Sequence, residues 1–368
     1  MLERLNDPEL GRKMLKLVRE KAARAVDRLG RPAVLMEVCG THTTAIARSG
    51  LRGLLKGLAE LRSGPGCPVC VTAAGDIEAM IGLARIPGVT VATFGDMLRV
   101  PGRDSSLERE RAAGARIKIV YSPADAVELA KNNPAGEVVF LGVGFETTAP
   151  LVALTIKQAA DAGLDNFTVY AAHKIMPPAL RSLLDSGDLN VDGLILPGHV
   201  CAVTGSEPFG FIGEDYGIPA VVAGFTLVDI IDAVNALLDK ILLKDFRTGN
   251  NYRWVVKPEG NGEARRMLED CFHTGDAAWR GLGMIKGSGL MIREELAAYD
   301  ARNKFGLEAS VVAEPPGCRC GELLRGLIVP TDCRLFGSRC TPTSPVGPCM
   351  VSSEGACAAY YRYERGEV

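Results

Sequence analysis

The sequence lacks the features that direct a chain to a membrane or to nucleic acid. It has no run of about 18 apolar residues, and its opening segment, MLERLNDPELGRKMLKLVREKAARAV, is typical of a charged amphipathic helix, not of a signal peptide. Lysine and arginine are scattered and the formal net charge is −2. No Gly-x4-Gly-Lys-Thr phosphate loop is present, so nucleotide binding has no support. We therefore expect a cytoplasmic protein that binds neither membranes nor nucleic acid.

Cysteine, by contrast, is abundant and unevenly placed. The chain has 11 cysteines, an odd number, and without an export signal a secreted disulfide framework is not expected. Six of them fall within the last 51 residues. Reduced thiols or metal ligands are the roles that remain for so many cysteines.

The middle of the chain alternates short apolar segments with helical periodicity. Helices are predicted over 43–61 and 227–243, and the predicted strands are AVLMEV, VTVATFG, RIKIVY, EVVFLGVG, FTVYAAH, VDGLILPG and PAVVAGF. That rhythm is typical of a parallel sheet covered by helices. After about residue 245 the sequence becomes rich in turns and then in proline, glycine and cysteine. The length allows two or three domains.

Two pairs of motifs indicate a duplication. CGTHTTA at 39–45 matches VGFETTA at 143–149, and PGCPVCVT at 65–72 matches PGHVCAVT at 197–204. We therefore predict an α/β protein with two similar parallel-sheet domains and a third, cysteine-rich iron–sulfur domain. The predicted bounds are 30–135, 136–245, and 1–29 together with 246–368.

The motifs follow predicted strands, and this placement has a consequence for function. Open parallel sheets bind ligands beyond the carboxyl ends of their strands, and domain interfaces are preferred places for sites. If the two domains face one another, one wall of a cleft carries three thiols and a histidine, and the other an acid and a histidine. These residues are Cys39, His42, Cys67 and Cys70 on the first wall, and Glu146 and His199 on the second.

The thiols of the first wall suit metal or redox chemistry. Cys39 ends a strand where a helix begins, so the helix dipole would stabilise its thiolate as a nucleophile or metal ligand, although it could equally be a small buried residue. Cys67 and Cys70 form a Cys-x-x-Cys turn that can chelate a soft metal or alternate between dithiol and disulfide. Together the three would make a metal site with open coordination positions.

The remaining polar candidates have less specific patterns. Glu146 and His199 could act in acid–base chemistry or orient a ligand, or be structural groups with satisfied hydrogen bonds. His173 and Lys174 follow another strand and could bind an anion, although a solvated loop explains them as well. Cys201 is expected to be a packing residue.

The tail holds more thiols than a small domain needs for packing. Six prolines from Pro315 to Pro348 prevent a long helix or a central strand, so a 4Fe-4S cluster bound by four thiolates would hold the segment together. Zinc and free thiols are the alternatives. The spacing does not fix which four bind. The predicted ligands are Cys320, Cys333, Cys340 and Cys357, with Cys318 and Cys349 as alternates that could exchange electrons with the cluster as thiols.

Taken together, the motifs resemble the HypD family of hydrogenase maturation proteins. They are CGTHT, GPGCPVC, GFETT, PGHV and the tail from EPPGCRCGE to CTPTSPVGPCMVSSEGACAAYY, in order along nearly the whole chain. Cys201 follows PGHV where the family pattern has serine, which touches no proposed ligand.

The resemblance implies a scaffold on which one iron ion of NiFe hydrogenases acquires two cyanides and a carbon monoxide. It implies HypC as a partner in the scaffold and in delivery to the hydrogenase large subunit, and HypE as the cyanide donor. Cys39, Cys67 and Cys70, with His42 beside them, match the family's iron-handling residues. The resemblance also implies the 4Fe-4S cluster in the third domain.

Two other functions use the same residues. One is a cluster-dependent thiol–disulfide oxidoreductase, which would need only the Cys67–Cys70 pair, whereas an iron scaffold should also need Cys39. The other is a hydro-lyase with an open cluster iron, for which no set of substrate-binding arginines can be identified.

Overall fold

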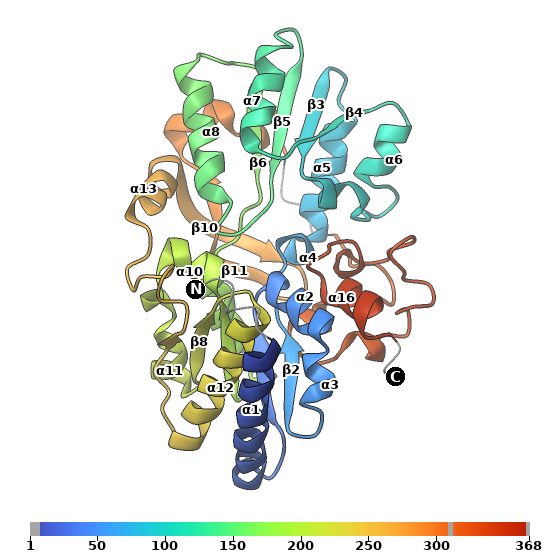
Figure 1. Cartoon of the computed structure of the whole chain (residues 1–368). Helices are drawn as coiled ribbons and strands as arrows, with labels where there is room; N and C mark the ends of the chain where they lie inside the picture. The colour runs from blue at the N-terminus through green and yellow to red at the C-terminus, as the bar shows by residue number, and fades with distance from the viewer. Residues whose placement is uncertain (1–7, 308–311, 366–368) are drawn as a thin grey trace.

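Two parallel sheets with helices on their faces make up most of the molecule (Figure 1). The computed structural model describes residues 8–307 and 312–365. The first sheet has the order β2 (Ala59–Ser63), β1 (Ala33–Glu37), β7 (Gly193–Pro197), β8 (Ala220–Ala223) and β9 (Gly249–Asn250). The second has the order β4 (Arg116–Ile119), β3 (Val89–Thr93), β5 (Glu137–Gly142) and β6 (Phe167–Ala171). The predicted α/β class is confirmed.

The two sheets share one topology. In each, the strands lie in the spatial order second, first, third, fourth along the chain, and their neighbours pair in parallel. In doubly wound sheets of this order the ligand site lies where the winding reverses, between the first and third strands. Those points are β1 with β7 in the first sheet and β3 with β5 in the second.

The pairing of strands cuts across the predicted domain boundaries. β7 and β8 lie in the predicted second domain, yet β7 pairs with β1, so the chain builds the whole second sheet between β2 and β7. The boundary at 135/136 falls between β4 and β5 of the second sheet. The aligned motifs are also not equivalent, because CGTHT follows the first strand of its sheet and GFETT the third. A local strand–helix rhythm does not tell which strands are neighbours.

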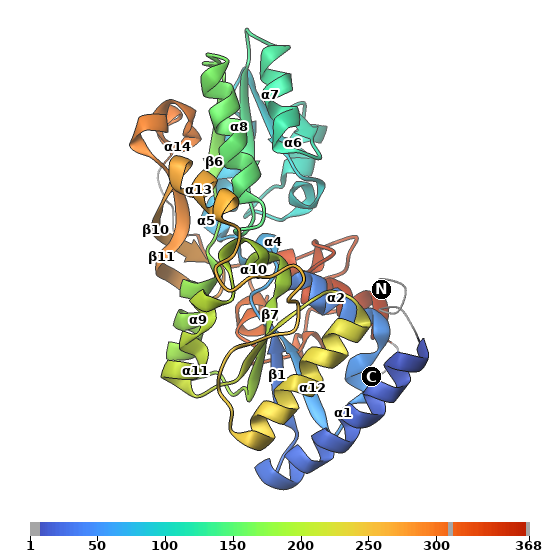
Figure 2. The same ribbon diagram turned by 60° about the vertical axis from the view of Figure 1, so that its left-hand side comes forward.

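Helix pairs cover one face of each sheet. α1 (Pro8–Leu29) and α12 (Leu227–Leu243) lie side by side over the first sheet (Figure 2), where Val18 and Leu237 share a core with Leu35. α7 (Pro123–Lys131) and α8 (Ala149–Asp161) cover the second. The segment predicted to join the tail, 1–29, therefore packs on the first sheet instead, with residues 1–7 outside the described residues.

The predicted helix over 43–61 is wrong in its second half. α2 (Gly40–Ser49) ends at Gly50, whose φ of 66° is left-handed and stops the helix. A short turn, α3 (Leu51–Leu54), leads to β2, which forms the edge of the first sheet. Because β2 is polar and lies at an edge, it lacks the apolar run by which the other strands were predicted.

Further elements connect the sheets and the tail. An antiparallel hairpin, β10 (Phe272–Trp279) and β11 (Gly283–Ile292), packs on the second sheet, where Phe272 and Leu290 join its core. The remaining helices are α4 (Pro68–Val71), α5 (Ala74–Ala84), α6 (Leu107–Ala112), α9 (Met176–Asp185), α10 (Gly198–Thr204), α11 (Phe211–Tyr216), α13 (Gly262–Cys271) and α14 (Ala301–Lys304). Over the described residues, no helix is both long and apolar enough to cross a bilayer.

The cysteine-rich tail consists of turns and two short helices, α15 (Cys320–Leu324) and α16 (Ala356–Tyr363). It lies beside α2, close to the level where the two sheets meet (Figure 1). Thr41 at the start of α2 donates a hydrogen bond to Glu354 at 2.9 Å, and Thr44 donates one to the Ser353 carbonyl at 2.9 Å. The tail is thus held against the carboxyl end of the first sheet.

Candidate functional site

Most of the predicted site residues lie at the carboxyl end of the first sheet. Cys39 and His42 follow β1, Cys67 and Cys70 follow β2, and His199 follows β7. β1 and β7 are the strands at which the winding reverses, the place where ligands bind in such sheets. The topology therefore gathers five of the six predicted site residues at one edge of the first sheet, all but Glu146.

The loop that carries Cys67 is pressed against the backbone at Cys39. The Gly40 N–H donates to the Gly66 carbonyl at 3.0 Å. A Cβ at Gly66 would lie 2.1 Å from the Cys39 nitrogen, so only glycine fits. Gly66, the second glycine of GPGCPVC, thus allows the two thiol motifs to come into contact.

Cys67 and Cys70 are joined by a disulfide. Cys67 is also the N-cap of α4, and its sulfur accepts the Cys70 N–H at 3.2 Å. Of the three thiols predicted to bind a metal, only Cys39 is free in this state.

Burial keeps the Cys39 thiol protonated. The side chain is buried, and loss of hydration raises its pKa to about 12. The predicted stabilisation of a thiolate by α2 is therefore outweighed by desolvation. A positive ion at the sulfur would have to displace the proton.

Glu37, the last residue of β1, fixes the turn at Cys39. One of its oxygens accepts the Cys39 N–H at 3.0 Å, and the other accepts the Thr43 hydroxyl. Glu37 is 1% exposed, and burial raises its pKa to about 7, against hydrogen bonds from Ser63 and Thr43. We did not predict a role for this residue. An acidic residue inside the otherwise apolar run AVLMEV was the sequence feature that could have indicated one.

His42 and His199 both stack on one phenylalanine, Phe225. The His42 ring is stacked 5.0 Å from Phe225, and the His199 ring 3.7 Å from it. His42 Nε2 pairs with the Gly224 carbonyl at 2.8 Å, so Nε2 carries the proton and the buried Nδ1, which has no partner, keeps a free lone pair. Burial lowers the His42 pKa to about 4. His199 is exposed and belongs to the same sheet as Cys39, so its predicted place on the opposite wall is wrong.

Glu146 approaches this site from the second sheet. It is 3% exposed, accepts the Met176 N–H at 2.8 Å, and has a second oxygen without a partner. Burial raises its pKa to about 7. Burial raises the pKa of Cys201, and the charge of Glu146 raises it further.

All six tail cysteines line one cavity, with mainly apolar residues as its other walls. The Cys320 and Cys349 sulfurs are 2.7 Å apart, and both residues are buried, so these two form a pair. Burial raises the pKa of Cys340 and Cys357. In the part of the chain that the structure describes, no three Cys, His, Asp or Glu side chains are arranged around a metal position.

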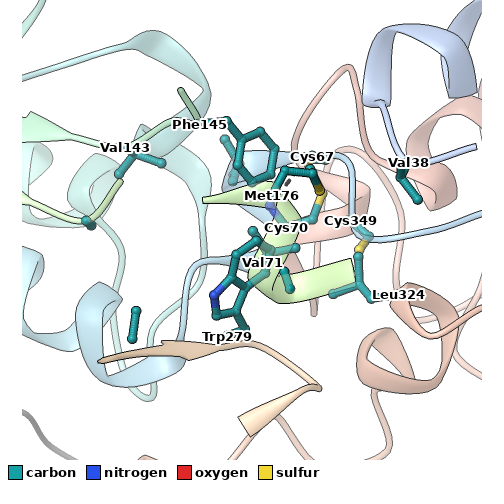
Figure 3. Packing of buried hydrophobic residues seen from close by; sticks show 14 of the residues in the cluster. Val38, Cys67, Cys70, Val71, Val143, Phe145, Met176, Trp279, Leu324 and Cys349 are labelled. Atoms are coloured by element: carbon teal, nitrogen blue, oxygen red, sulfur yellow. Dashed lines mark hydrogen bonds between the residues drawn. A yellow bond between two sulfur atoms is a disulfide. The ribbon is translucent and has the colours of Figure 1, made fainter. Parts of the chain in front are cut away.

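The tail cavity shares two lining residues, Leu323 and Cys349, with a cavity at the Cys67–Cys70 disulfide. This second, small cavity is lined by Cys67, Cys70 and Cys349, with Leu324 on its wall (Figure 3). Cys349 therefore contacts Cys320 and also lines the cavity at the disulfide.

Comparison with known proteins identifies the family of this chain. The HypD family model, described as the hydrogenase formation hypA family, matches residues 11–364. The chain belongs to the HypD family.

Relatives match over almost their whole lengths. This HypD-family chain is 45% identical to hydrogenase maturation factor HypD of Rhodobacter capsulatus, over 97% of this chain and 96% of that protein. It is 42% identical to hydrogenase maturation factor HypD of Escherichia coli strain K12, over 98% and 97%. The resemblance on the motifs is thereby confirmed.

Arg280 is a further residue of this HypD-family site that the sequence analysis did not find. It is 2% exposed, its Nε donates to the Thr72 carbonyl at 3.0 Å, and its main-chain N–H to the Val71 carbonyl at 2.8 Å. Its Nη1 pairs with Glu314, while Nη2 is buried without a partner. Its charge also acts on Cys318, Cys320 and Cys349. A single arginine in the turn between β10 and β11 gives no pattern in sequence.

Proposed function

We propose that this chain is a cytoplasmic scaffold on which the iron of NiFe hydrogenases receives two cyanides and a carbon monoxide. HypC would bind beside the site and pass the iron to the hydrogenase large subunit, and HypE would supply cyanide. The observation that carries the proposal is the contact of Cys39 with the Cys67–Cys70 turn. This contact lies where the winding of the first sheet reverses, and the chain belongs to the HypD family. Iron is the cargo, not a resident cofactor.

The proposed role of Cys39 is to hold the iron through its sulfur. A thiolate is a soft ligand, suited to low-spin iron that carries cyanide. Because burial keeps this thiol neutral, iron binding would release its proton. Glu37 holds the Cys39 backbone, and the free Nδ1 lone pair of His42 offers a neutral nitrogen close by.

The disulfide gives the scaffold two states. While Cys67 and Cys70 are bonded to each other, neither is a thiolate, and Cys39 is the single sulfur ligand of this turn. Reduction adds two electrons and two protons and releases two more sulfur ligands. The predicted three-thiolate site is thus a property of the reduced state.

The tail supports the second candidate, thiol–disulfide exchange, as part of the same function. The Cys320 and Cys349 dithiol would give two electrons and two protons to the Cys67–Cys70 disulfide, becoming a disulfide itself while Cys67 and Cys70 become thiols. The 2.7 Å contact of Cys320 with Cys349, and the cavity that Cys349 shares with Cys67 and Cys70, support this step.

The tail residues also fit a 4Fe-4S cluster. Six sulfurs face one cavity with mainly apolar walls, and two of them already form a pair. We therefore propose Cys318, Cys333, Cys340 and Cys357 as the ligands, with Cys318 in place of the predicted Cys320. A bound cluster would supply electrons.

Infrared spectroscopy of anaerobically purified protein with HypC and HypE tests the scaffold. We expect cyanide and carbonyl stretching bands that disappear in Cys39→Ala but persist in Cys201→Ala, a neighbouring buried thiol, with sulfide content unchanged in both. Bands of equal strength in Cys39→Ala, or no bands in any preparation that contains the cluster, would contradict the proposal.

The exchange step has its own prediction. After addition of dithionite, Cys349→Ser should leave Cys67–Cys70 oxidised where the wild-type protein becomes reduced, because the attacking sulfur beside the disulfide is gone. Alkylation followed by mass spectrometry of the peptide that contains Cys67 measures this, with the remote buried Cys271→Ser as the control. Equal reduction of all three proteins would show that Cys349 is not the donor.

A further inference from the structure

A polar cavity lies where α5 begins, beside the second sheet, and has no part in the proposed function. Its walls are the start of α5, the end of β6, the β10–β11 hairpin and α14. The volume is about 220 Å³. This is smaller than the sites of drug-sized ligands but large enough for a small ion.

At its centre one carboxylate is shared by three donors. Asp76 accepts the Tyr170 hydroxyl at 2.9 Å and Arg302 Nη2 at 2.7 Å on one oxygen, and Lys174 Nζ at 3.5 Å on the other. The Arg302 guanidinium also lies over the Tyr170 ring, 4.2 Å from its centre. Both Asp76 oxygens are therefore engaged, and the carboxylate has little capacity for further donors.

Several donors in this cavity have no acceptor among the residues that the structure describes. Lys174 is 3% exposed, and its ammonium has three N–H groups but one long contact. Arg302 Nε is buried without a partner. His173, which also lines the cavity, is 1% exposed, and neither ring nitrogen has a partner. Buried polar groups normally find a partner, so these groups together call for an acceptor-rich ligand.

The beginning of α5 adds donors at the same place. Ala73, the N-cap, offers no side-chain cap, and Ala73 and Gly75 both line the cavity. The first N–H groups of a helix have no partner within the helix and favour a negative charge. The acidic groups are Asp76, which is already paired, and exposed Asp276 at the rim, which accepts the Gly287 N–H at 3.0 Å. The cavity thus has more hydrogen-bond donors than acceptors, and a ligand with several oxygen acceptors would fit it.

We propose that this cavity is a binding site for a small oxyanion, a carboxylate, bicarbonate or phosphate group, held by Lys174, Arg302 and the first N–H groups of α5. His173 contributes one further N–H. The inference goes beyond the proposed function and does not depend on it, since Cys39 and the tail cysteines take no part.

Calorimetric titration of the whole protein with sodium phosphate, bicarbonate or acetate, against sodium chloride at equal ionic strength, tests the site. We expect saturable binding of at least one of these anions, at least about tenfold weaker in Lys174→Gln, because a charge-assisted hydrogen bond is lost. Lys304→Gln, on the same helix as Arg302 but paired with Glu137, is the control and should bind as the wild type does.

Asp76→Asn separates a binding site from a structural ion pair. If the site binds anions, removing the internal carboxylate frees Lys174 and Arg302, so the variant should bind the anion at least as tightly and gain more thermal stability from it than the wild type. If the cluster only joins α5 to β6 and α14, the variant is destabilised and no anion restores it. Absence of saturable binding in both the wild type and Asp76→Asn, with each shown to be folded by circular dichroism, overturns the proposal.

Discussion

Gly66→Ala is expected to destabilise the folded protein by about 3 kcal/mol or more, with much of the chain lost to the insoluble fraction. The new Cβ would lie 2.1 Å from the Cys39 nitrogen and 2.3 Å from the Val38 carbonyl carbon. Both neighbours are backbone atoms just after β1, which is paired on both sides in the sheet, so neither can move without disturbing the sheet. Urea unfolding of the soluble fraction measures the loss.

Gly82→Ala is the matched control. Gly82 lies inside α5, and a Cβ there would meet nothing within 4 Å. Alanine is the better helix former by about 0.5–1 kcal/mol, so this variant should be slightly more stable than the wild type. Unfolding midpoints for Gly66→Ala that match those of the control would mean that the Cys67 loop does not press on Cys39.

Glu146→Gln should become more stable relative to the wild type as the pH rises. Burial raises the Glu146 pKa from 4.5 to about 7, so between these values the folded state holds a proton that the unfolded state has released. Rising pH through this window therefore costs the wild type up to about 3 kcal/mol of unfolding free energy, a loss that the neutral amide does not suffer. Near pH 5 the two proteins should be of similar stability.

Comparison of variant with wild type at each pH is essential here. Burial lowers the pKa of His42 to about 4, so its contribution to stability is lost as the pH falls below about 6.5, opposite in sign to that of Glu146. The difference between the two proteins cancels this background. Exposed Glu108→Gln, whose carboxylate is hydrated in both states, should show the same difference from wild type at pH 5 and pH 8. If the difference in unfolding free energy between Glu146→Gln and the wild type is also the same at pH 5 and pH 8, the prediction is wrong.

Much of the fold was predictable because its signals are local. The apolar runs at β1, β5 and β7 are buried on both faces, as strands of covered parallel sheets are, and they gave the class directly. The pairing of β1 with β7 was not predictable, because both strands are equally apolar and the sequence around them does not indicate which strand each one pairs with. Strand β2 was missed because its polar edge position removes the apolar signal.

The candidate site was predictable to a similar extent. Cys39, Cys67 and Cys70 stand in motifs with unusual spacing, and glycine at position 66 accounts for their proximity. Glu37 and Arg280 were missed because each acts through one contact formed across the fold, which leaves no periodic trace. The pairing of Cys320 with Cys349 was missed for the same reason, since 29 residues of irregular chain separate them.

The insertion of the second sheet into the first sets an order of events on the ribosome. Glu37 pairs with Ile195, so β1 has to wait for the synthesis of more than 150 further residues before its central neighbour exists. At about 5–20 residues per second this is a delay of roughly 10–30 s. The second sheet is contiguous in the chain and has its own core, so it can form in that interval, while β1, β2 and the Cys67–Cys70 turn remain exposed. The thiols of a nascent chain are therefore open to oxidation or to foreign metals before their pocket is built.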